Sequence, residues 1–375
     1  MRGKLMLKKI IFVVKLSLFP IWGWPLSKDA TKLKITCVKL YHYLCIFILM
    51  CLEIPIIYSI INHLNNFIVL VELIFELSAI THTIGNFICH RINKRHIQYV
   101  TFEMIRFSKL IEPHEDIIIQ RYIDKLILFH AASILNVYTS VVIVAFIIPI
   151  TMNQPFPLTT EYPFDVSYQP LKTIIYIHQV VAGLYVAGQL SSNIFMALLL
   201  WLASARIEIL TDELRKTTDV FHLVKCIKKH HYLLKFATET AIAARPFALT
   251  TICCSTTSMV ILGILLLTTP SKLLIIKNIG LVLTGLSEVF AYTWPAEQLI
   301  YTSQDVAQAA FDIAWYDQSI KVQKCIQIII RRSQKPITVA IACLMPTLSL
   351  NYFASYCSTI ISFFTTFRAF LDDDE

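Results

Sequence analysis

The sequence predicts an all-α membrane protein with seven transmembrane helices, a cytoplasmic amino terminus and an extracellular carboxyl terminus. Three observations support this prediction: the composition, the number of long apolar stretches and the distribution of basic residues. Of the 375 residues, 56% are hydrophobic and 15% are charged, and the mean hydropathy is +0.63. Because soluble domains carry about 25% charged residues, this composition indicates a polytopic membrane protein.

Seven apolar stretches are long enough to cross a bilayer as helices. A hydrocarbon core about 30 Å thick requires about 20 helical residues. The stretches are 36–61, 66–88, 126–150, 173–203, 248–269, 273–296 and 341–370. Most hydrophilic residues lie in the connections 89–125, 204–247 and 297–336, which are alternate connections and therefore lie on one side of the membrane.

The basic residues give the orientation. Of the 33 Lys and Arg residues, 29 lie in the segment up to Lys39 or in those three connections, and only four lie elsewhere. The positive-inside rule then places the amino terminus in the cytoplasm. Rhodopsin-like receptors have the opposite orientation, and their Asp/Glu-Arg-Tyr and Asn-Pro-x-x-Tyr motifs are absent from the expected spans. The net charge of +8 needs no nucleic-acid partner, because basic loops face the anionic inner leaflet.

The chain divides into four units. Residues 1–35 form a cytoplasmic and interfacial segment, in which 18–25 contains two tryptophans and two prolines and is expected to lie along the membrane surface. Residues 36–296 form helices one to six with cytoplasmic extensions. Residues 297–336 form a cytoplasmic segment before the last span. Residues 337–375 form a seventh helix and an acidic tail.

Within the second unit, Glu72 and Glu76 lie one helical turn apart inside an apolar span. Charged residues at membrane depth indicate either an ion site or internally hydrogen-bonded groups, and both interpretations stay open. The proline- and aromatic-rich connection 151–170 is expected to form a lid or vestibule wall, or an ordered surface loop without a ligand role.

The pattern also predicts how the helices are connected. A turn at Pro113 separates two helices, and the fourth span continues into the cytoplasm as one long helix through residues 222–240. A tight hairpin at 270–272 joins spans five and six.

The seventh span is expected to be helical from 341 to 370, with one small and polar face. This stripe consists of Asn351, Ser355, Ser358, Ser362, Thr365 and Ala369, and the opposite face carries Phe353, Ile360, Phe364 and Phe367. Because a polar stripe is costly against lipid, it faces other helices or water. Helix packing and pore lining are both compatible with this pattern.

No catalytic constellation is present. The chain lacks a Gly-rich phosphate loop, an H-E-x-x-H sequence and a nucleophile elbow. None of the ten cysteines lies in a predicted outer connection, and none has a C-x-x-C spacing. We therefore expect no enzymatic activity, cofactor, metal site or disulfide framework.

The last quarter of the chain resembles the carboxyl-terminal region of the insect odorant receptors. The resemblance rests on 303–311 (SQDVAQAAF), 315–317 (WYD), 331–336 (RRSQKP) and 348–370. The amino-terminal segment 18–25, with its Gly-Trp-Pro sequence, is also similar. The sister gustatory receptors carry Thr-Tyr, five residues, then Gln-Phe in the seventh span. Here the same spacing gives Ser-Phe at 362–363 and Ala-Phe at 369–370, which favours the odorant branch.

The resemblance implies a ligand-gated, non-selective cation channel in the plasma membrane of olfactory sensory neurons. In this family four subunits surround one pore. A subunit of the odorant-specific type binds a small volatile odorant and forms a heterotetramer with the odorant co-receptor. Permeating cations and membrane lipid are the other expected partners. A gustatory-type channel, a metabotropic seven-helix receptor and a transporter are the alternatives.

The same resemblance, with the chain direction, suggests three sets of site residues. The ligand pocket is expected in the outer half of spans two, three, four and six, at Leu73, Tyr138, Val142, Phe146, Tyr176, Gln179, Ala182, Leu283 and Leu286, where ordinary bundle packing is the alternative. The pore set is Ser362, Thr366, Ala369 and Phe370, with Phe370 as a gate element and Thr366 as an ion-facing hydroxyl. The subunit-interface set is Trp315, Tyr316, Lys321, Gln327 and Arg331. The acidic residues 372–375 either concentrate cations at the outer mouth or form a solvated tail.

Overall fold

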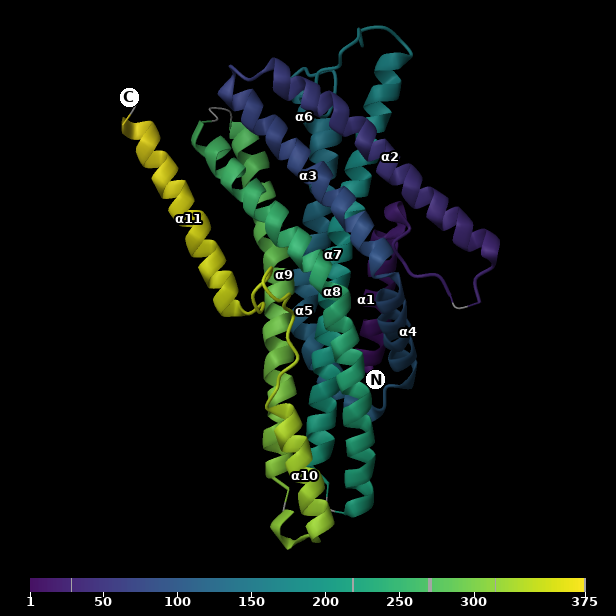
Figure 1. Ribbon diagram of the computed structural model, residues 1–375. Helices are drawn as coiled ribbons and strands as arrows, with labels where there is room; N and C mark the ends of the chain where they lie inside the picture. Colours follow the sequence, from purple (N-terminus) through teal and green to yellow (C-terminus); the bar gives the residue numbers. More distant parts are fainter. Residues whose placement is uncertain (28, 218, 269–271, 314, 374–375) are drawn as a thin grey trace.

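The structure is a computed structural model that describes residues 1–27, 29–217, 219–268, 272–313 and 315–373. These residues form a helical bundle (Figure 1), and the only β-structure among them is one isolated bridge. The α-helices are α1 (Arg2–Ser17), α2 (Lys32–Asn62), α3 (Phe67–Ile92), α4 (Lys94–Leu110), α5 (Pro113–Val142), α6 (Ile148–Thr151), α7 (Leu171–Arg215), α8 (Val220–Thr268), α9 (Lys272–Phe311), α10 (Ile320–Ser333) and α11 (Leu350–Asp373). Short 3-10 helices occur at Phe19–Ile21 and Trp315–Asp317, and a π-helix, η2, at Ile143–Ile147. The predicted all-α class is confirmed.

Six helical stretches in the described residues are long and apolar enough to cross a membrane. They are α2, α3, α5 with its continuation to Thr151, α7, α8 and α9, and each corresponds, to within a residue at its ends, to one of the first six predicted spans or contains it. The seventh predicted span corresponds to α11, whose 24 residues extend for about 36 Å. The seven predicted spans therefore all have a helix in the structure.

Helix α7 is the centre of the bundle. Every residue from Ser191 to Ile207 is buried, which explains why this part of the sequence is apolar or small on all sides. It packs against α5, α8 and α9, and α8 and α9 also pack on each other (Figure 1). The long parts of α7, α8 and α9 continue together beyond the apolar region toward α10.

The predicted long cytoplasmic helix is wrong in one respect. Helix α7 ends at Arg215, and the segment 222–240 belongs to α8 instead. Asp219 provides the local reason, because its Oδ1 accepts a 2.7 Å hydrogen bond from the backbone N–H of His222 and so caps the start of a new helix. The predicted turn at Pro113 is present, where Glu112 and Glu115 form a capping box. Of the hairpin at 270–272, residues 270 and 271 lie outside the described residues.

The amino-terminal segment lies against the bundle. The backbone N–H groups of Gly3 and Lys4, in the first turn of α1, donate to the Asp116 carboxylate at 3.2 and 2.7 Å, which ties α1 to α5. Part of the segment 18–25, expected on the membrane surface, is instead inside the core, because Leu18 and Ile21 are fully buried. Ile21 approaches α7 at Gly188, where a Cβ atom would lie 2.6 Å from the Ile21 Cγ2 atom.

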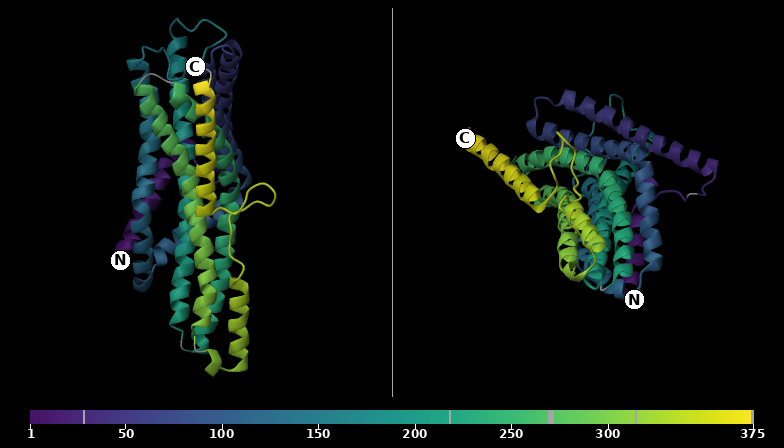
Figure 2. Two further views of the ribbon diagram at one scale, coloured as in Figure 1. Left: turned by 90° about the vertical axis from the view of Figure 1, so that its left-hand side faces the viewer. Right: turned by 60° about the horizontal axis from the view of Figure 1, so that its bottom comes forward.

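Helix α11 stands at the side of the bundle (Figures 1 and 2), where it packs mainly against α8 and α9. Its Phe367 ring also stacks on the Phe67 ring at the start of α3. It begins at Leu350, so the predicted helical start near 341 is wrong. Residues 336–349 form an irregular connection with a bridge between Ile341 and Met345, and Cys343 has a positive φ of 64°. Pro346 explains this difference, because it disfavours helical geometry at the residue before it.

Candidate functional site

A cavity of about 250 Å³ lies between α3, α5, α7, α8 and α9. These include all four helices in which the ligand pocket was expected, together with α8. Most of its lining is apolar, including Phe75, Val137, Val144, Val186 and Met259. Enclosed, largely apolar cavities with a few polar groups are typical of sites for small molecules.

The connection between α6 and α7 covers one end of this cavity. Gln154, Pro157, Leu158 and Thr159 belong to the lining. The Gln179 side chain of α7 accepts a 3.0 Å hydrogen bond from the Leu158 N–H and donates a 3.1 Å bond to the Tyr162 hydroxyl. One side chain therefore fixes two points of the connection above the cavity.

Glu76 of α3 holds the same connection from the other side. Its Oε1 accepts from the Thr159 N–H and hydroxyl at 3.2 and 3.1 Å, and its Oε2 accepts from the Thr160 hydroxyl at 3.3 Å. Farther along, the Glu161 N–H donates to the Ser59 hydroxyl of α2 at 2.6 Å. The connection is thus an ordered wall of the cavity.

Glu72 and Glu76 have separate partners. Glu72 Oε1 lies 2.6 Å from the Lys277 ammonium of α9, and both side chains are mostly buried. The two carboxylates do not share a ligand position, so this part of the structure favours the internally hydrogen-bonded interpretation over an ion site. A third carboxylate, Glu288, lies farther along α9, where its Oε2 accepts a 3.2 Å hydrogen bond from Ser255.

The structure brings two of the nine expected ligand residues, Gln179 and Ala182, to the cavity surface. The remaining seven lie elsewhere. Val142, Phe146 and Leu283 point outward with 51%, 48% and 56% of their surface exposed, and Leu73 is buried away from the cavity. Leu286 lines a neighbouring cavity. On α3, α5 and α9 the lining residues are the direct neighbours of those expected, and a shift of one residue turns a side chain by about 100° around a helix.

Tyr138 and Tyr176 have structural partners instead of cavity positions. The Tyr138 hydroxyl donates to the Ser17 carbonyl at 2.6 Å, which links α5 to the end of α1. The Tyr176 hydroxyl donates to the Ala145 carbonyl at 2.5 Å, within the π-helix η2. Pro149 has no N–H to reach this carbonyl four residues earlier, so Tyr176 satisfies a group that the proline leaves free.

Sequence reasoning missed the contribution of α8, whereas the connection 151–170 was expected to form a lid or vestibule wall, or a surface loop without a ligand role. Ser255, Ser258 and Met259 of α8 line the cavity. Only Glu288 carried a usable signal, because a carboxylate inside an apolar span requires an explanation. The small and apolar residues of α8 resemble ordinary core residues, and no sequence pattern distinguishes them.

The polar stripe of α11 faces away from the rest of the chain. All six of its residues are exposed, while Ile360, Phe364 and Phe367 line a second cavity of about 370 Å³ between α11, α8 and α9.

Of the expected pore residues, Ser362, Thr366 and Ala369 are exposed, and the Phe370 side chain lies outside the described part of the structure. The side chains of 372 and 373 and all of 374–375 are also outside it. Met259 of α8 lines both cavities and so lies between them.

The expected interface residues lie at the opposite end of the bundle from the covering connection, on or next to α10 (Figure 1). Tyr316, Lys321, Gln327 and Arg331 are exposed. Trp315 is half-buried, and its ring lies 6.2 Å from that of Phe311 and 6.2 Å from that of Tyr316.

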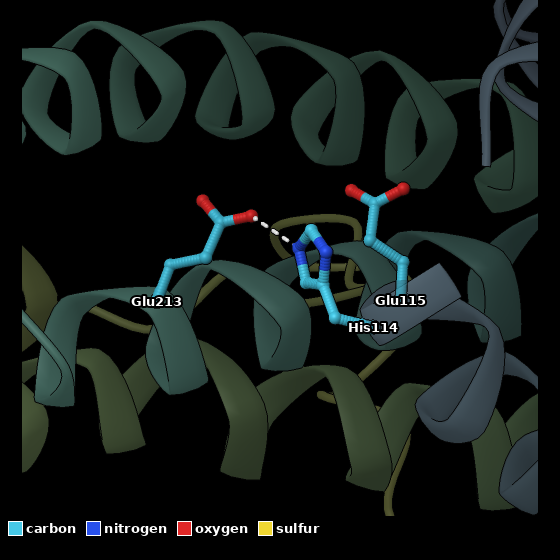
Figure 3. Close-up of side chains that lie close together, drawn as sticks. All are labelled: His114, Glu115 and Glu213. Carbon is cyan, nitrogen blue, oxygen red and sulfur yellow. Dashed lines mark hydrogen bonds and ion pairs between the residues drawn. The ribbon is translucent and has the colours of Figure 1, made fainter. Parts of the chain in front are cut away.

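One cluster of potential metal ligands occurs in the described residues, away from the cavity. His114, Glu115 and Glu213 have ligand atoms within 4.8 Å of one another (Figure 3). The Lys229 ammonium lies 2.6 Å from Glu213 Oε1 and 3.5 Å from Glu115 Oε1, between the two carboxylates. An ion-pair network accounts for this arrangement.

The long apolar helices define a multi-pass membrane protein, with a largely apolar cavity between them. The model of the family described as 7tm Odorant receptor matches residues 66–361. The chain therefore belongs to the odorant receptor family.

Individual relatives are similar over parts of the chain. Odorant receptor 22c of Drosophila melanogaster is 29% identical over 44% of this chain, and odorant receptor 13a of the same species is 23% identical over 60%. The matched segments span 40% and 59% of those two proteins. The odorant receptor coreceptor of Aedes aegypti is 33% identical over 23% of this chain and 18% of its own length.

The fold is also that of a solved receptor. The olfactory receptor OR5 from Machilis hrabei, in complex with eugenol, superposes with a TM-score of 0.81 over 97% of this chain and 98% of that chain. The sequence identity is 16%, so this likeness concerns the fold.

Proposed function

We propose that this chain is the odorant-binding subunit of a ligand-gated, non-selective cation channel, assembled with the odorant co-receptor in the plasma membrane of olfactory sensory neurons. The observation that supports this proposal most directly is the largely apolar cavity of about 250 Å³ beside the helices on which α11 packs. A small volatile molecule is the ligand that such a cavity suits. Eugenol, bound to the Machilis receptor of the same fold, is a small and mostly apolar molecule.

Helix α11 is the pore-lining element in this proposal. Its apolar face packs on α8 and α9, and its stripe of Asn, Ser, Thr and Ala residues is exposed in the single chain. Exposed hydroxyl groups at membrane depth are unfavourable against lipid, so an aqueous path between subunits is the environment that suits them. The expected gate position, Phe370, follows the stripe toward the outer end of the helix.

Helix α8 provides a physical connection between ligand and pore. Ser255, Met259 and Leu262 face the ligand cavity, and Gly263 lies next to Phe364 of α11, where a Cβ atom would be 3.3 Å from its ring. A ligand that fills the cavity presses on α8 within one helical turn of this contact. Gating then consists of a shift of α8 and α9 that changes the position of α11, and differential binding to the two positions drives it.

The co-receptor partnership is supported by similarity and by the exposed assembly segment. Co-receptors from Aedes aegypti and Aedes albopictus are each 33% identical to this chain over 86 residues. Around α10, large apolar side chains are exposed, with Tyr316, Ile320 and Ile328 at 67%, 71% and 68%. Exposed apolar side chains on a short helix at one end of the bundle indicate a contact with another subunit.

Current recordings test this function. The chain is expressed with and without the co-receptor, and a panel of volatile compounds is applied rapidly to excised patches without nucleotide. We expect inward cation current within milliseconds that depends on both subunits. A response that requires GTP and a diffusible messenger would indicate a metabotropic receptor, and stoichiometric ligand uptake without current would indicate a transporter.

A further inference from the structure

One carboxylate in the ligand cavity has an unused hydrogen-bonding position. Glu288 of α9 is 8% exposed and belongs to the cavity lining. Its Oε2 accepts from Ser255 at 3.2 Å, but its Oε1 has no hydrogen-bond partner in the described part of the chain. Burying an unpaired carboxyl oxygen costs free energy, so a group that donates to it would gain a favourable contact.

The other charged groups of the lining already have partners. Glu72 is paired with Lys277 at 2.6 Å, and Glu76 accepts three hydrogen bonds from residues 159 and 160. His82 Nε2 lies 3.1 Å from the Asn86 amide and 3.3 Å from the Thr251 hydroxyl. Among the described lining residues, Glu288 is the one with a buried side-chain nitrogen or oxygen atom that lacks a partner.

Lys277 cannot supply that partner from its own position. The two residues are eleven positions apart on α9, so about 16 Å of helix separates them. Lys277 lies toward the covered end of the cavity and Glu288 toward the interior of the bundle. At its inner end the cavity lining therefore carries the Glu288 carboxyl group. No cationic side chain among the described residues lies against this group.

We propose that Glu288 determines which ligands this cavity takes, by accepting a hydrogen bond from the head group of a small apolar molecule that carries an amine or a hydroxyl. The apolar body of the ligand lies along Val137, Val186 and Met259, and its N–H or O–H reaches the Glu288 carboxyl group, whose buried Oε1 turns toward the cavity on binding. This inference rests on the proposed function only where it assumes that ligand binding opens the channel. The ligand preference itself is measured by binding, without current recordings.

Matched sets of probes separate the head group from the shape. Benzylamine, benzyl alcohol, anisole and ethylbenzene have nearly the same size, as do hexylamine, 1-hexanol, methyl pentyl ether and heptane. Binding to the purified full chain is measured by ligand-induced thermal stabilisation and by displacement. We expect the amine or the alcohol to bind roughly tenfold or more tightly than the ether of the same set, because a hydrogen bond to a carboxylate provides that much discrimination.

Two substitutions show whether Glu288 is responsible. Glu288→Leu removes the acceptor, so the advantage of the donor-bearing probes over the ethers is expected to disappear while ether binding is kept. Glu288→Gln keeps the shape of the side chain and one acceptor oxygen, so alcohol binding is expected to be retained. It removes the negative charge, so binding of an amine that is protonated is expected to weaken. If Glu288→Leu does not fold, Glu288→Met, which also lacks an acceptor oxygen, replaces it, and an unchanged donor preference in Glu288→Met overturns the inference.

The outcomes are distinct. Equal binding of donors and ethers to the unmodified chain, an unchanged donor preference in Glu288→Leu, or no binding of any probe would each overturn the inference. A Glu288-dependent donor preference without any odorant-evoked current would support the inference and contradict the proposed channel function instead.

Discussion

Single side chains in this protein compensate for irregularities in the helices around the cavity. Tyr176 is the clearest case, because its hydroxyl donates to the Ala145 carbonyl, to which Pro149, four residues later, has no N–H to donate. The ring itself does not line the cavity. Its role in the bundle is therefore to hold the π-helical part of α5 against α7.

Replacing Tyr176 by Phe removes this hydrogen bond and keeps the ring. We expect a loss of about 1 kcal/mol in stability, seen as a lower thermal denaturation temperature in detergent, and an equal change in potency for all ligands. The control is Tyr301→Phe, at a side chain that is 65% exposed. A Tyr176→Phe variant that discriminates between ligands would show that the hydroxyl reaches the bound molecule.

The Glu72–Lys277 ion pair allows a second test at the residue scale. Lys277→Met leaves the Glu72 carboxylate mostly buried without its 2.6 Å partner, and breaking such a pair from one side costs on the order of 1–3 kcal/mol. Combining it with Glu72→Gln removes the uncompensated charge, so the double variant should recover much of the lost thermal stability. Additive losses in the double variant would mean that the two groups do not stabilise each other.

Residue positions around the cavity were the least predictable feature. The helices of the expected pocket were identified, but Leu73, Val142, Phe146 and Leu283 lie one position from lining residues. A difference of one residue is about a quarter turn, and periodicity cannot resolve it in spans that are apolar on every face. Glu288 was detectable in principle, because charge inside an apolar stretch is visible in any sequence.

Among the helices, α11 is the one whose exposed face most needs a partner or an aqueous path outside the single chain. Its predicted small and polar stripe is exposed, and its aromatic face packs inward at Phe353, Phe364 and Phe367. The periodicity identified these faces correctly, because here polar and aromatic residues alternate clearly. The start of the helix was not predictable from apolarity alone, since 341–348 is as apolar as the helix that follows.

Cysteine substitution along α11 tests the aqueous path. With the co-receptor present, Thr366→Cys and Ser362→Cys should make odorant-evoked current sensitive to a charged, membrane-impermeant thiol reagent. Phe364→Cys, on the face packed against α8 and α9, is the matched control and should be insensitive, and the unmodified chain controls for the native cysteines. Equal insensitivity of all three variants at normal surface expression would place the stripe in helix packing.

The exposed face of α10 allows a test of the proposed contact with the co-receptor. Its inner face, with Val322, Ile326 and Ile329, is buried, and Ile328 on the outer face is 68% exposed. Ile328→Asp should reduce co-purification with the co-receptor without lowering the thermal stability of the isolated subunit. Ile326→Asp, at a side chain 1% exposed, should instead destabilise the subunit itself. Normal co-purification of Ile328→Asp and of Arg331→Ala would exclude this surface from the interface.

For the whole molecule, composition and charge were sufficient to predict the architecture. An all-helical bundle with seven long helices follows from the need to satisfy every backbone group inside a membrane. The structure agrees with the charge pattern, because the covering connection and the end of α11 lie at one end of the bundle and α10 at the other (Figures 1 and 2). The break between α7 and α8 escaped prediction because its cap, Asp219, is a single polar residue in a polar segment.

The central claim is that a molecule bound in the cavity between α3, α5, α7, α8 and α9 opens a pore beside α11. Gly183 of α7 lines this cavity, and a Cβ atom there would make an ordinary 3.5 Å contact with Val141. Gly280 of α9 is outside the lining, with nothing within 4 Å of its added Cβ. Both positions therefore have room for a Cβ atom, and only the side chain added at Gly183 would lie beside the cavity.

The most direct measurement compares odorant-evoked currents of Gly183→Phe and Gly280→Phe, each expressed with the co-receptor and matched for surface level. We predict that Gly183→Phe raises the half-maximal odorant concentration at least tenfold or abolishes the current, because its ring occupies the ligand volume. Gly280→Phe should respond like the unmodified subunit. An unchanged concentration dependence in Gly183→Phe would contradict the account, since it would place the activating ligand outside this cavity.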